Sequence, residues 1–424
     1  MSRHERDEEI MSATIQRDRQ IPGLIADSDR DEPTPDVIEG IRARFPTETE
    51  YDRMLTRKME RRAGEGYRSF DLDLLTAALE NMLREVLPSS RFEVRNARWL
   101  TGGASKIQMG FTLRYDDSVA GEVTEDLVLR MEPPESLNAT SRMREFEVIN
   151  ALAGTVPVPT VRWVDEDARW FPEPALVYTW VHGSAKPSRA QSRIAGIGIN
   201  FGPELREVLA PQFVDLLARI HTFDVTAAKL DHYEKPVVAT TESALWQLNR
   251  ARRVWEEDRG EDFPLLDAAA GWLEDNLPVL DRVSLVHGDY RGGNFLFDEN
   301  TGSVTAILDW ERSFLGDRHR DLAWATLYPF GHPSEDGSEF LATGLLPTAV
   351  FFEMYEQASG LTVDPDKLTF YRILNEYQSV VTALGSAYRV SKLGKTHQDV
   401  LLTGLEATGY LMALQLGQDL EEVL

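Results

Sequence analysis

The sequence contains no cysteine, and its eight histidines are scattered along the chain. The absence of cysteine excludes disulfides, thiolate catalysis and cysteine-bound zinc or iron–sulfur centres. The histidines do not show the spacing typical of a metal site. Disulfide-stabilised folds and thiolate centres are therefore not among the functions to consider.

The sequence also lacks a long apolar run and an excess of basic residues. No uninterrupted apolar stretch could span a bilayer, and the first ten residues, MSRHERDEEI, are too charged for a signal peptide. We therefore expect a cytoplasmic protein. A net charge of -25 argues against general affinity for nucleic acid or anionic membranes. This charge could favour a cationic substrate, whereas a CoA ester would depend on a few well-placed arginines.

The most informative part of the sequence runs from Leu285 to Trp324. It contains Asp289 in the triplet HGD, Asn294 five residues later and Asp309 in the triplet LDW. The apolar run before HGD predicts a buried strand, with His-Gly as a turn that presents Asp289. Two further apolar runs separated by DENTG predict a β-hairpin. Such a hairpin would bring Asn294 close to Asp309.

These three side chains have the chemistry of a phosphotransfer site. Asp289 can accept a proton from a substrate hydroxyl, while Asn294 and Asp309 offer hard oxygen ligands to Mg²⁺. The alternative is that Asp289 caps a helix and Asp309 ends a strand, because Asp and Asn are common in caps and turns. Three oxygen ligands in this order favour phosphotransfer.

The pattern HGDYRxGNxLFD, followed by LDWE and GDxxxDLAW, resembles the catalytic core of the aminoglycoside phosphotransferase and choline kinase family, relatives of the protein kinases. It is most similar to the branch of hydroxyacyl-CoA kinases and of kinase portions fused to certain acyl-CoA dehydrogenases. The resemblance implies an α+β, bilobal, protein-kinase-like fold with a small antiparallel-sheet lobe and a larger, mainly helical lobe. It also implies ATP and Mg²⁺ as cofactors.

A glycine-containing segment between two strand-like runs is the first candidate for nucleotide binding. Gly102 and Gly103 let the backbone approach a phosphate, and Ser105 could hydrogen-bond it. A Gly-Gly hairpin turn explains the same residues equally well.

The next strand, Leu127–Met131, would carry a phosphate-binding cation. The resemblance places Arg130 where most of the superfamily has a lysine that touches the α- and β-phosphates, and a guanidinium can grip phosphate with two hydrogen bonds. The resemblance also implies that Glu145, on a helix beginning near Thr140, pairs with Arg130. Glu147 is the alternative partner.

The apolar strand Ala175–Val181 matches the family's hinge between lobes. By resemblance, backbone groups of Thr179 and Val181 would meet the edge of the adenine. His221 ends the amphipathic helix expected over Leu205–Ile220, where a histidine is more often a capping or packing residue than a base.

Four further expectations concern the large lobe. Pro211 can start a second helix. The stretch from 196 to 202 lacks GxGxxG spacing and is expected to be a surface loop that borders the substrate cleft. Asp321 is expected to cap the helix that follows it. His287 is expected to orient the catalytic loop.

The chain length of 424 residues predicts two lobes and an extension. We expect residues 1–90 to form a charged tail and a helical extension packed on the small lobe, with a cap at Ser69 or Asp71. Residues 91–181 would form the nucleotide-binding lobe and hinge. Residues 182–424 would form the catalytic and substrate-binding lobe.

The sequence thus predicts an ATP- and Mg²⁺-dependent phosphotransferase that acts on a hydroxyl group of a small molecule. The leading substrate is a hydroxyacyl-CoA or a related metabolic alcohol, and the alternative is an aminoglycoside or another cationic antibiotic. A hypothesis of another class, motivated by Arg130 and the long extension, is a catalytically silent nucleotide-binding scaffold. No nucleic acid or membrane partner is expected, and no oligomeric state is indicated.

Overall fold

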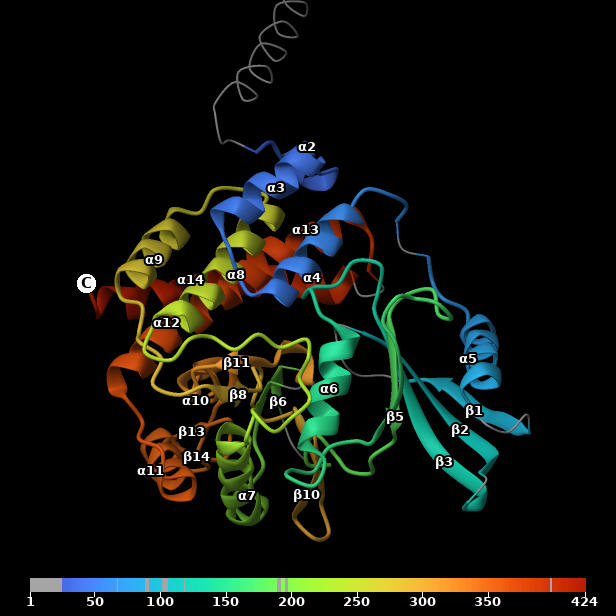
Figure 1. Cartoon of the computed structure of the whole chain (residues 1–424). Coiled ribbons are helices and arrows are strands. Elements are labelled where there is room, and N and C mark those ends of the chain that lie inside the picture. The colour runs from blue at the N-terminus through green and yellow to red at the C-terminus, as the bar shows by residue number, and fades with distance from the viewer. Residues whose placement is uncertain are drawn as a thin grey trace, which may run out of the picture.

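The structure is a computed structural model that describes residues 25–66, 68–87, 91–100, 106–117, 119–188, 192–194, 197–396 and 399–424. Within these residues the chain forms two lobes, a small sheet-containing lobe and a larger helical lobe (Figure 1). The expected α+β, bilobal architecture is therefore confirmed.

The small lobe contains a five-stranded antiparallel sheet with strand order β1-β2-β3-β5-β4. Its strands are β1 (Phe92–Trp99), β2 (Ile107–Asp117), β3 (Gly121–Met131), β4 (Val161–Asp165) and β5 (Ala175–Thr179). Helix α5 (Leu72–Val86) begins at the expected cap, where the Asp71 side chain accepts from the backbone N–H of Asp73. Its buried side chains, including Leu75 and Leu79, form one core with β2 and β3.

Helix α6 (Arg142–Leu152) lies between the sheet and the large lobe (Figure 1). Val148 and Leu152 of α6 belong to the same apolar core as Leu176 of β5 and Leu285 of the large lobe. The two lobes therefore share a continuous apolar core through α6.

The large lobe is built from helices and short strand pairs. Its helices are α7 (Pro203–Thr222), α8 (Glu242–Asp258), α9 (Pro264–Asp275), α10 (His319–Ala325), α11 (Thr348–Ser359), α12 (Pro365–Val380), a π-helical segment (Val381–Ala387), α13 (Tyr388–Leu393) and α14 (Asp399–Glu421), with 3₁₀ turns at Trp310–Arg312 and Tyr328–Phe330. Its strands are β6 (Ser192–Ile194) with β7 (Ile197–Ile199), β8 (Ser284–Val286) with β11 (Phe314–Gly316), β9 (Phe295–Asp298) with β10 (Ser303–Ile307), and β12 (His332–Pro333), β13 (Phe340–Ala342) and β14 (Leu346–Pro347).

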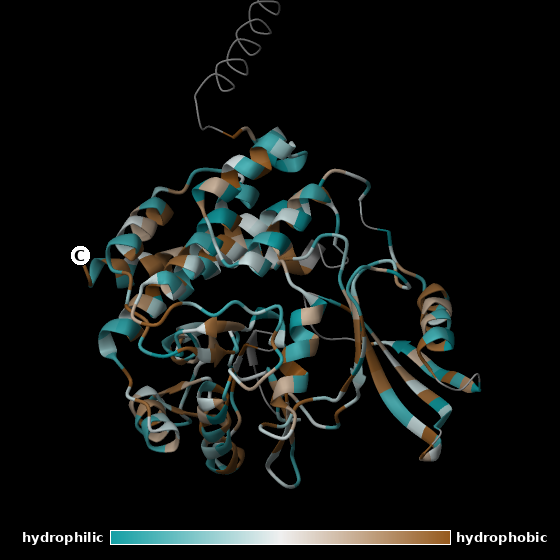
Figure 2. Ribbon diagram, viewed as in Figure 1, coloured by the Kyte–Doolittle hydropathy of each residue, from teal (hydrophilic) through white to brown (hydrophobic). Residues whose placement is uncertain are grey.

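Apolar and polar residues alternate around most helices of both lobes (Figure 2). Among the described residues, no helix combines the length and apolar character that a membrane crossing would need.

Two expectations for the large lobe were wrong. Helix α7 continues through Pro211, because Leu209 and Phe213 on either side are buried in one core and packing outweighs the missing N–H. The stretch that includes β7 is not a surface loop. Ile199 and Phe201 are buried, and Phe201 stacks on Phe295 with the ring centroids 5.8 Å apart.

The N-terminal extension also differs from its expected position. Helices α2 (Asp27–Asp31), α3 (Pro35–Arg44) and α4 (Thr49–Glu60) lie over α8 of the large lobe (Figure 1), and α5 alone packs on the sheet. Ion pairs and apolar packing both hold α4 there: Lys58 and Arg62 pair with Asp258 of α8 at 2.8 and 2.5 Å, and Tyr51 and Met54 pack on Val286.

The same segment reaches the small lobe. Arg53 of α4 pairs with Glu166, and Arg61, directly after α4, pairs with Glu173 at 2.6 Å. Both acids lie in the connection between β4 and β5. The α4 segment is therefore tied by ion pairs to both lobes.

Replacement of Asp258 by alanine should destabilise the fold, because Lys58 and fully buried Arg62 would lose their shared carboxylate. Breaking a buried ion pair on one side costs about 3–5 kcal/mol, and Glu135, 3.1 Å from Arg62, should keep the loss near the lower value. Equilibrium unfolding in urea measures the change. Asp215→Ala, which removes an exposed ion pair with Arg219, is the control and should shift stability by less than about 1 kcal/mol. Equal effects of both substitutions would contradict the structural role of Asp258.

Candidate active site

The loop that carries HGD follows β8 directly. The imidazole of His287 is fully buried, donates from Nε2 to the Leu308 carbonyl at 2.9 Å, and accepts from the Asp289 N–H at Nδ1 (3.2 Å). Both ring nitrogens are thus used to fix the loop, as expected for an orienting residue. Gly288 has a φ of 80°, and a Cβ there would lie 2.5 Å from the Arg312 carbonyl oxygen. Only glycine fits this turn without strain.

The carboxylate of Asp321 binds the backbone of the same loop. It accepts the backbone N–H groups of His287 (2.7 Å) and Gly288 (2.8 Å) and lies 3.2 Å from Nε2 of His221. The expectation that Asp321 caps α10 was wrong: Arg318 is at the N-cap, and the Asp321 side chain points to the HGD loop instead. Burial raises the pKa of Asp321, but the hydrogen bond from His221 and the nearby histidines lower it below its ordinary value.

His221 is fully buried and packs inside the large lobe. Its Nδ1 lies 2.9 Å from the Tyr355 hydroxyl, and burial lowers its pKa. A neutral imidazole can donate from Nε2 to Asp321 and accept at Nδ1 from the Tyr355 hydroxyl. This tautomer gives His221, Asp321 and Tyr355 each a hydrogen-bond partner. The expected packing role of His221 is confirmed.

The Asp289 side chain is held in one orientation by three donors. Its Oδ1 accepts from Arg291 Nε (2.9 Å) and Trp324 Nε1 (2.8 Å), and its Oδ2 accepts from Asn294 Nδ2 (2.8 Å). The indole of Trp324 was not identified from the sequence, although it ends the quoted DLAW motif. Asp289 is thus a preorganised carboxylate at the tip of the loop.

The predicted hairpin is present as β9 and β10, and it brings Asn294 and Asp309 together. The Leu308 N–H donates to the Asn294 carbonyl at 2.8 Å. Asn294 Nδ2 donates to both the carbonyl and the side chain of Asp289, which leaves the amide oxygen free of any donor in the described part of the chain. Asp309 has left-handed backbone (φ 61°), and its side chain is 40% exposed. These two oxygen-bearing groups fit Mg²⁺, which prefers such ligands.

Arg130 is almost fully buried and is surrounded by three carboxylates. Its guanidinium lies 3.2 Å from Glu145, 2.7 Å from Asp309 and 2.6 Å from Glu311. Burial lowers the pKa of Arg130, but the three acids raise it well above the ordinary value. The expected pair with Glu145 is therefore present, whereas Glu147 binds His232 at 2.7 Å.

A second buried charged group lies beside Arg130 and was not identified from the sequence. Lys106 and Arg142 both contact Glu132, at 2.8 and 2.9 Å. Burial raises the pKa of Glu132, but Lys106 and Arg142 lower it to about 2. No sequence pattern marks these residues, except that Lys106 directly follows the glycine-containing segment.

The hinge was predicted to meet the adenine through backbone groups of Thr179 and Val181. The Thr179 N–H already donates to the Thr160 carbonyl at 2.9 Å, so this N–H is not available to adenine. Val181 has no backbone hydrogen bond to any residue that the structure describes, so its backbone groups are available to a ligand. The predicted phosphate contacts Gly102, Gly103 and Ser105 lie outside the described residues.

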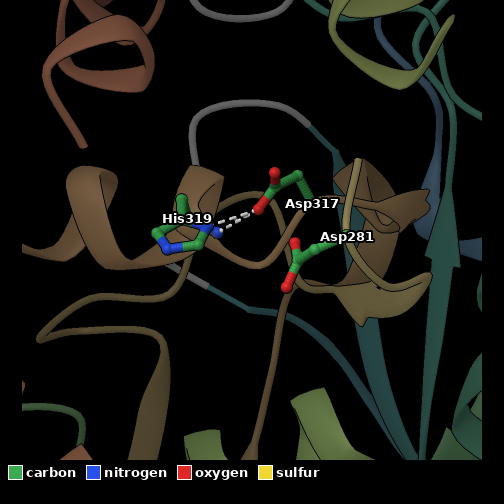
Figure 3. A group of neighbouring side chains, drawn as sticks. All are labelled: Asp281, Asp317 and His319. Atoms are coloured by element: carbon green, nitrogen blue, oxygen red, sulfur yellow. Dashed lines mark hydrogen bonds and ion pairs between the residues drawn. The ribbon is translucent and has the colours of Figure 1, made fainter. Parts of the chain in front are cut away.

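An acidic cluster in the large lobe resembles a metal site but has a different function. Side-chain atoms of Asp281, Asp317 and His319 lie within 4.8 Å of one another (Figure 3). Lys367 Nζ contacts Asp281 at 2.7 Å and Asp317 at 3.0 Å, so an ammonium group already supplies the cation. Arg318 contacts Asp281 as well, at 2.8 Å. We interpret this cluster as structural.

The sheet, the helix α6 and the loop–hairpin arrangement define the fold of a protein-kinase-like phosphotransferase. Residues 116–370 match the phosphotransferase enzyme family, and because the match covers more than half of the chain, the chain belongs to this family. A relative in Mus musculus, acyl-CoA dehydrogenase family member 10, is 29% identical over 279 residues, which are 63% of this chain and 25% of the relative. The chain thus spans about a quarter of the length of that relative.

Two solved structures show the same fold. A protein of Ralstonia eutropha described as a candidate aminoglycoside phosphotransferase has a TM-score of 0.59 and 24% identity, over 82% of this chain and 98% of that protein. A thermostable variant of the aminoglycoside phosphotransferase APH(4)-Ia, in a ternary complex with ADP and hygromycin B, has a TM-score of 0.51 and 14% identity, over 81% of this chain and 98% of its own.

Asp321→Asn should lower kcat by on the order of 10²-fold, because an amide NH₂ would face backbone N–H donors and displace the HGD loop. The affinity for nucleotide should fall less than kcat, since Asp321 contacts the HGD backbone and neither Asn294 nor Asp309. Steady-state kinetics and nucleotide titration measure the two effects. Asp215→Asn, on the exposed face of α7, is the matched control. A loss of nucleotide affinity equal to the loss in kcat would contradict a role in positioning the loop.

Glu132 should make stability depend on acid pH. Because its folded pKa of about 2 lies below the unfolded value, its contribution is present at neutral pH and is lost as the pH falls from about 4.5 towards 2. The difference corresponds to about 3 kcal/mol. Urea unfolding between neutral and acid pH, compared with Glu132→Gln, measures this contribution. The variant should lose less stability than the wild type over that range, and parallel curves would contradict the assignment.

Proposed function

We propose that this protein transfers the γ-phosphoryl group of ATP, with Mg²⁺, to a hydroxyl group of a small molecule. The observation that carries the proposal is the convergence of Asp289, Asn294 and Asp309 on one loop and one hairpin, with the pair of Arg130 and Glu145 beside them. These are the parts that phosphoryl transfer needs: a group that positions the hydroxyl, oxygen ligands for the metal, and a cation for the phosphates.

Each residue then has a separate role. Asp289, oriented by Trp324 and Asn294, positions the acceptor hydroxyl and takes its proton as transfer proceeds. The amide oxygen of Asn294 and the carboxylate of Asp309 would hold Mg²⁺, and Mg²⁺ when bound neutralises charge on the phosphates. Arg130 would bind the α- and β-phosphates, with Glu145 holding its guanidinium in place.

The adenine would meet the hinge at Val181, and the phosphates would lie near Gly102, Gly103 and Ser105. ATP is supported as the donor by the fold relative that binds ADP. The leading acceptor is a hydroxyacyl-CoA or a related metabolic alcohol, supported by the likeness to acyl-CoA dehydrogenase family member 10. The net charge of -25 favours the alternative, a cationic alcohol such as an aminoglycoside.

Two substitutions test these roles separately. Asp289→Asn should keep the fold and the affinity for Mg-ATP but lose transfer by roughly 10²–10⁴-fold, because it removes a general base. Asp309→Ala should weaken binding of Mg-ATP, because it removes a metal ligand. Mass spectrometry of hydroxyacyl-CoAs, aminoglycosides and simple alcohols incubated with Mg-ATP detects any acceptor that gains one phosphoryl group, and nucleotide titration measures binding.

The control is Asp231→Asn, an exposed carboxylate whose ion-pair partner is Lys229. Equal turnover in the wild type and both test variants would contradict the catalytic assignment. Binding of Mg-ATP by the wild type with no transfer to any acceptor would support the silent scaffold instead.

A further inference from the structure

Two arginines, Arg312 and Arg320, lie over the ring of Trp324 near the catalytic loop, and Arg250 is close to both of them. The guanidinium carbon of Arg312 is 4.8 Å from the Trp324 ring centroid, and that of Arg320 is 5.6 Å away. The same indole donates to Asp289 at 2.8 Å. Arg250 of α8 is close enough to Arg312 and Arg320 for their charges to repel. The cluster therefore begins one side chain away from the proposed base.

These arginines lack the acids that other buried arginines have. Within the described part of the chain, Arg62, Arg130, Arg142, Arg144, Arg253 and Arg389 each contact a carboxylate. By contrast, no carboxylate of the described residues lies within ion-pair distance of Arg250, Arg312 or Arg320. Arg320 is 2% exposed, donates from Nη2 to Gln378, and has no partner for Nε and Nη1 among the described residues.

Burial and neighbouring arginines lower the pKa of two of these arginines, and Asp321 and Glu48 offset this only in part. Burial lowers the pKa of Arg320 to about 9, with further lowering by Arg312 and Arg250, and burial lowers that of Arg250 to about 10. A buried cation without a counterion opposes folding unless a ligand compensates for it. Such groups concentrate where a protein binds or transforms a ligand.

A cavity adjoins the cluster. It has a volume of about 20 Å³, roughly that of one water molecule, and of the three arginines only Arg250 lines it, with Lys58 and Gln378 and without an acid. Gln378, which accepts from Arg320, connects the cavity to the arginines around Trp324.

The N-terminal extension forms one wall of this region. Tyr51 of α4 lies under the Arg250 guanidinium, with the guanidinium carbon 3.6 Å from its ring centroid. Tyr51 and Met54 also pack on Val286, the last residue before HGD. The position of α4 is therefore coupled to the arginine cluster and to the catalytic loop.

We infer that Arg250, Arg312 and Arg320 form a pocket for an anionic group of the acceptor, a carboxylate or a phosphate carried near the hydroxyl that Asp289 activates. The inference rests on the proposed function and names its substrate class as a hydroxylated anion. Guanidinium groups bind both kinds of anion through paired N–H donors. A polycationic aminoglycoside would be repelled at this position.

The experiment measures anion binding separately from transfer. The full chain is saturated with Mg-AMP-PNP, so that the nucleotide phosphates are in place, and is titrated calorimetrically with inorganic phosphate and, separately, with acetate. Saturable binding of at least one anion is expected in the wild type. Its affinity should fall by roughly 10- to 100-fold in Arg312→Gln and Arg320→Gln, the loss expected for a charge-assisted hydrogen bond. The affinity for Mg-AMP-PNP should not change.

The matched control is Arg219→Gln, which removes an exposed arginine of α7 and should bind anions as the wild type does. Arg312 is only half-buried, so Arg312→Gln carries the test if Arg320→Gln fails to fold. Arg312→Lys keeps the charge and should recover part of the affinity. Phosphate binding without acetate binding would identify a phosphate as the group, and the reverse result would identify a carboxylate.

The proposed pocket would be overturned if neither phosphate nor acetate showed saturable binding. Equal anion affinity in the wild type and in both glutamine variants would also overturn it. These results are independent of the proposed function, which is tested by transfer. If the arginines bind an anion but no acceptor is phosphorylated, the proposed anion pocket is supported and the proposed kinase activity is contradicted. If neutral and anionic acceptors are phosphorylated with equal kcat/KM, the proposed kinase activity is supported and the proposed anion pocket is contradicted.

Discussion

The buried carboxylate of Asp321 fixes the loop on which the candidate active site is built. It accepts two consecutive backbone N–H groups, from His287 and Gly288, and a third contact comes from His221. These donors keep the carboxylate ionised inside the protein, because a buried charge is tolerated when its hydrogen bonds are satisfied. With the backbone held in this way, the position of Asp289 follows from chain geometry, and Trp324 and Asn294 have only to orient its side chain.

The site is assembled from both lobes by charge. Arg130 of the small-lobe sheet contacts Asp309 and Glu311 of the large lobe, and Glu145 of α6 lies on the same guanidinium. The N-terminal segment adds ion pairs to α8 and to the β4–β5 connection. Most of this buried charge is balanced. Arg250, Arg312 and Arg320 have no carboxylate within ion-pair distance among the described residues. This difference from the other buried arginines supports a ligand at that position.

Much of this arrangement could be predicted from the sequence. Strand and hairpin signals around HGD are local, so the apolar runs correctly placed Asn294 next to Asp309. The pairing of Arg130 with Glu145 was implied by the resemblance to the family, and it is present. The path of α7 through Pro211, the burial of Phe201 and the docking of α4 on α8 were not predicted. Each depends on packing partners more than ten residues away, which local pattern does not contain.

The sequence by itself predicted the identity and order of the candidate site residues, because each lies beside a short apolar run that the local pattern marks. It also determined the family, through motifs confined to one continuous stretch. Only the tertiary structure decided that Asp321 binds the HGD loop rather than a helix end. Only the tertiary structure placed Arg250, from α8, beside Arg312 and Arg320. The physical reason is that burial and charge balance depend on which side chains meet in space, and those contacts join residues far apart in the chain.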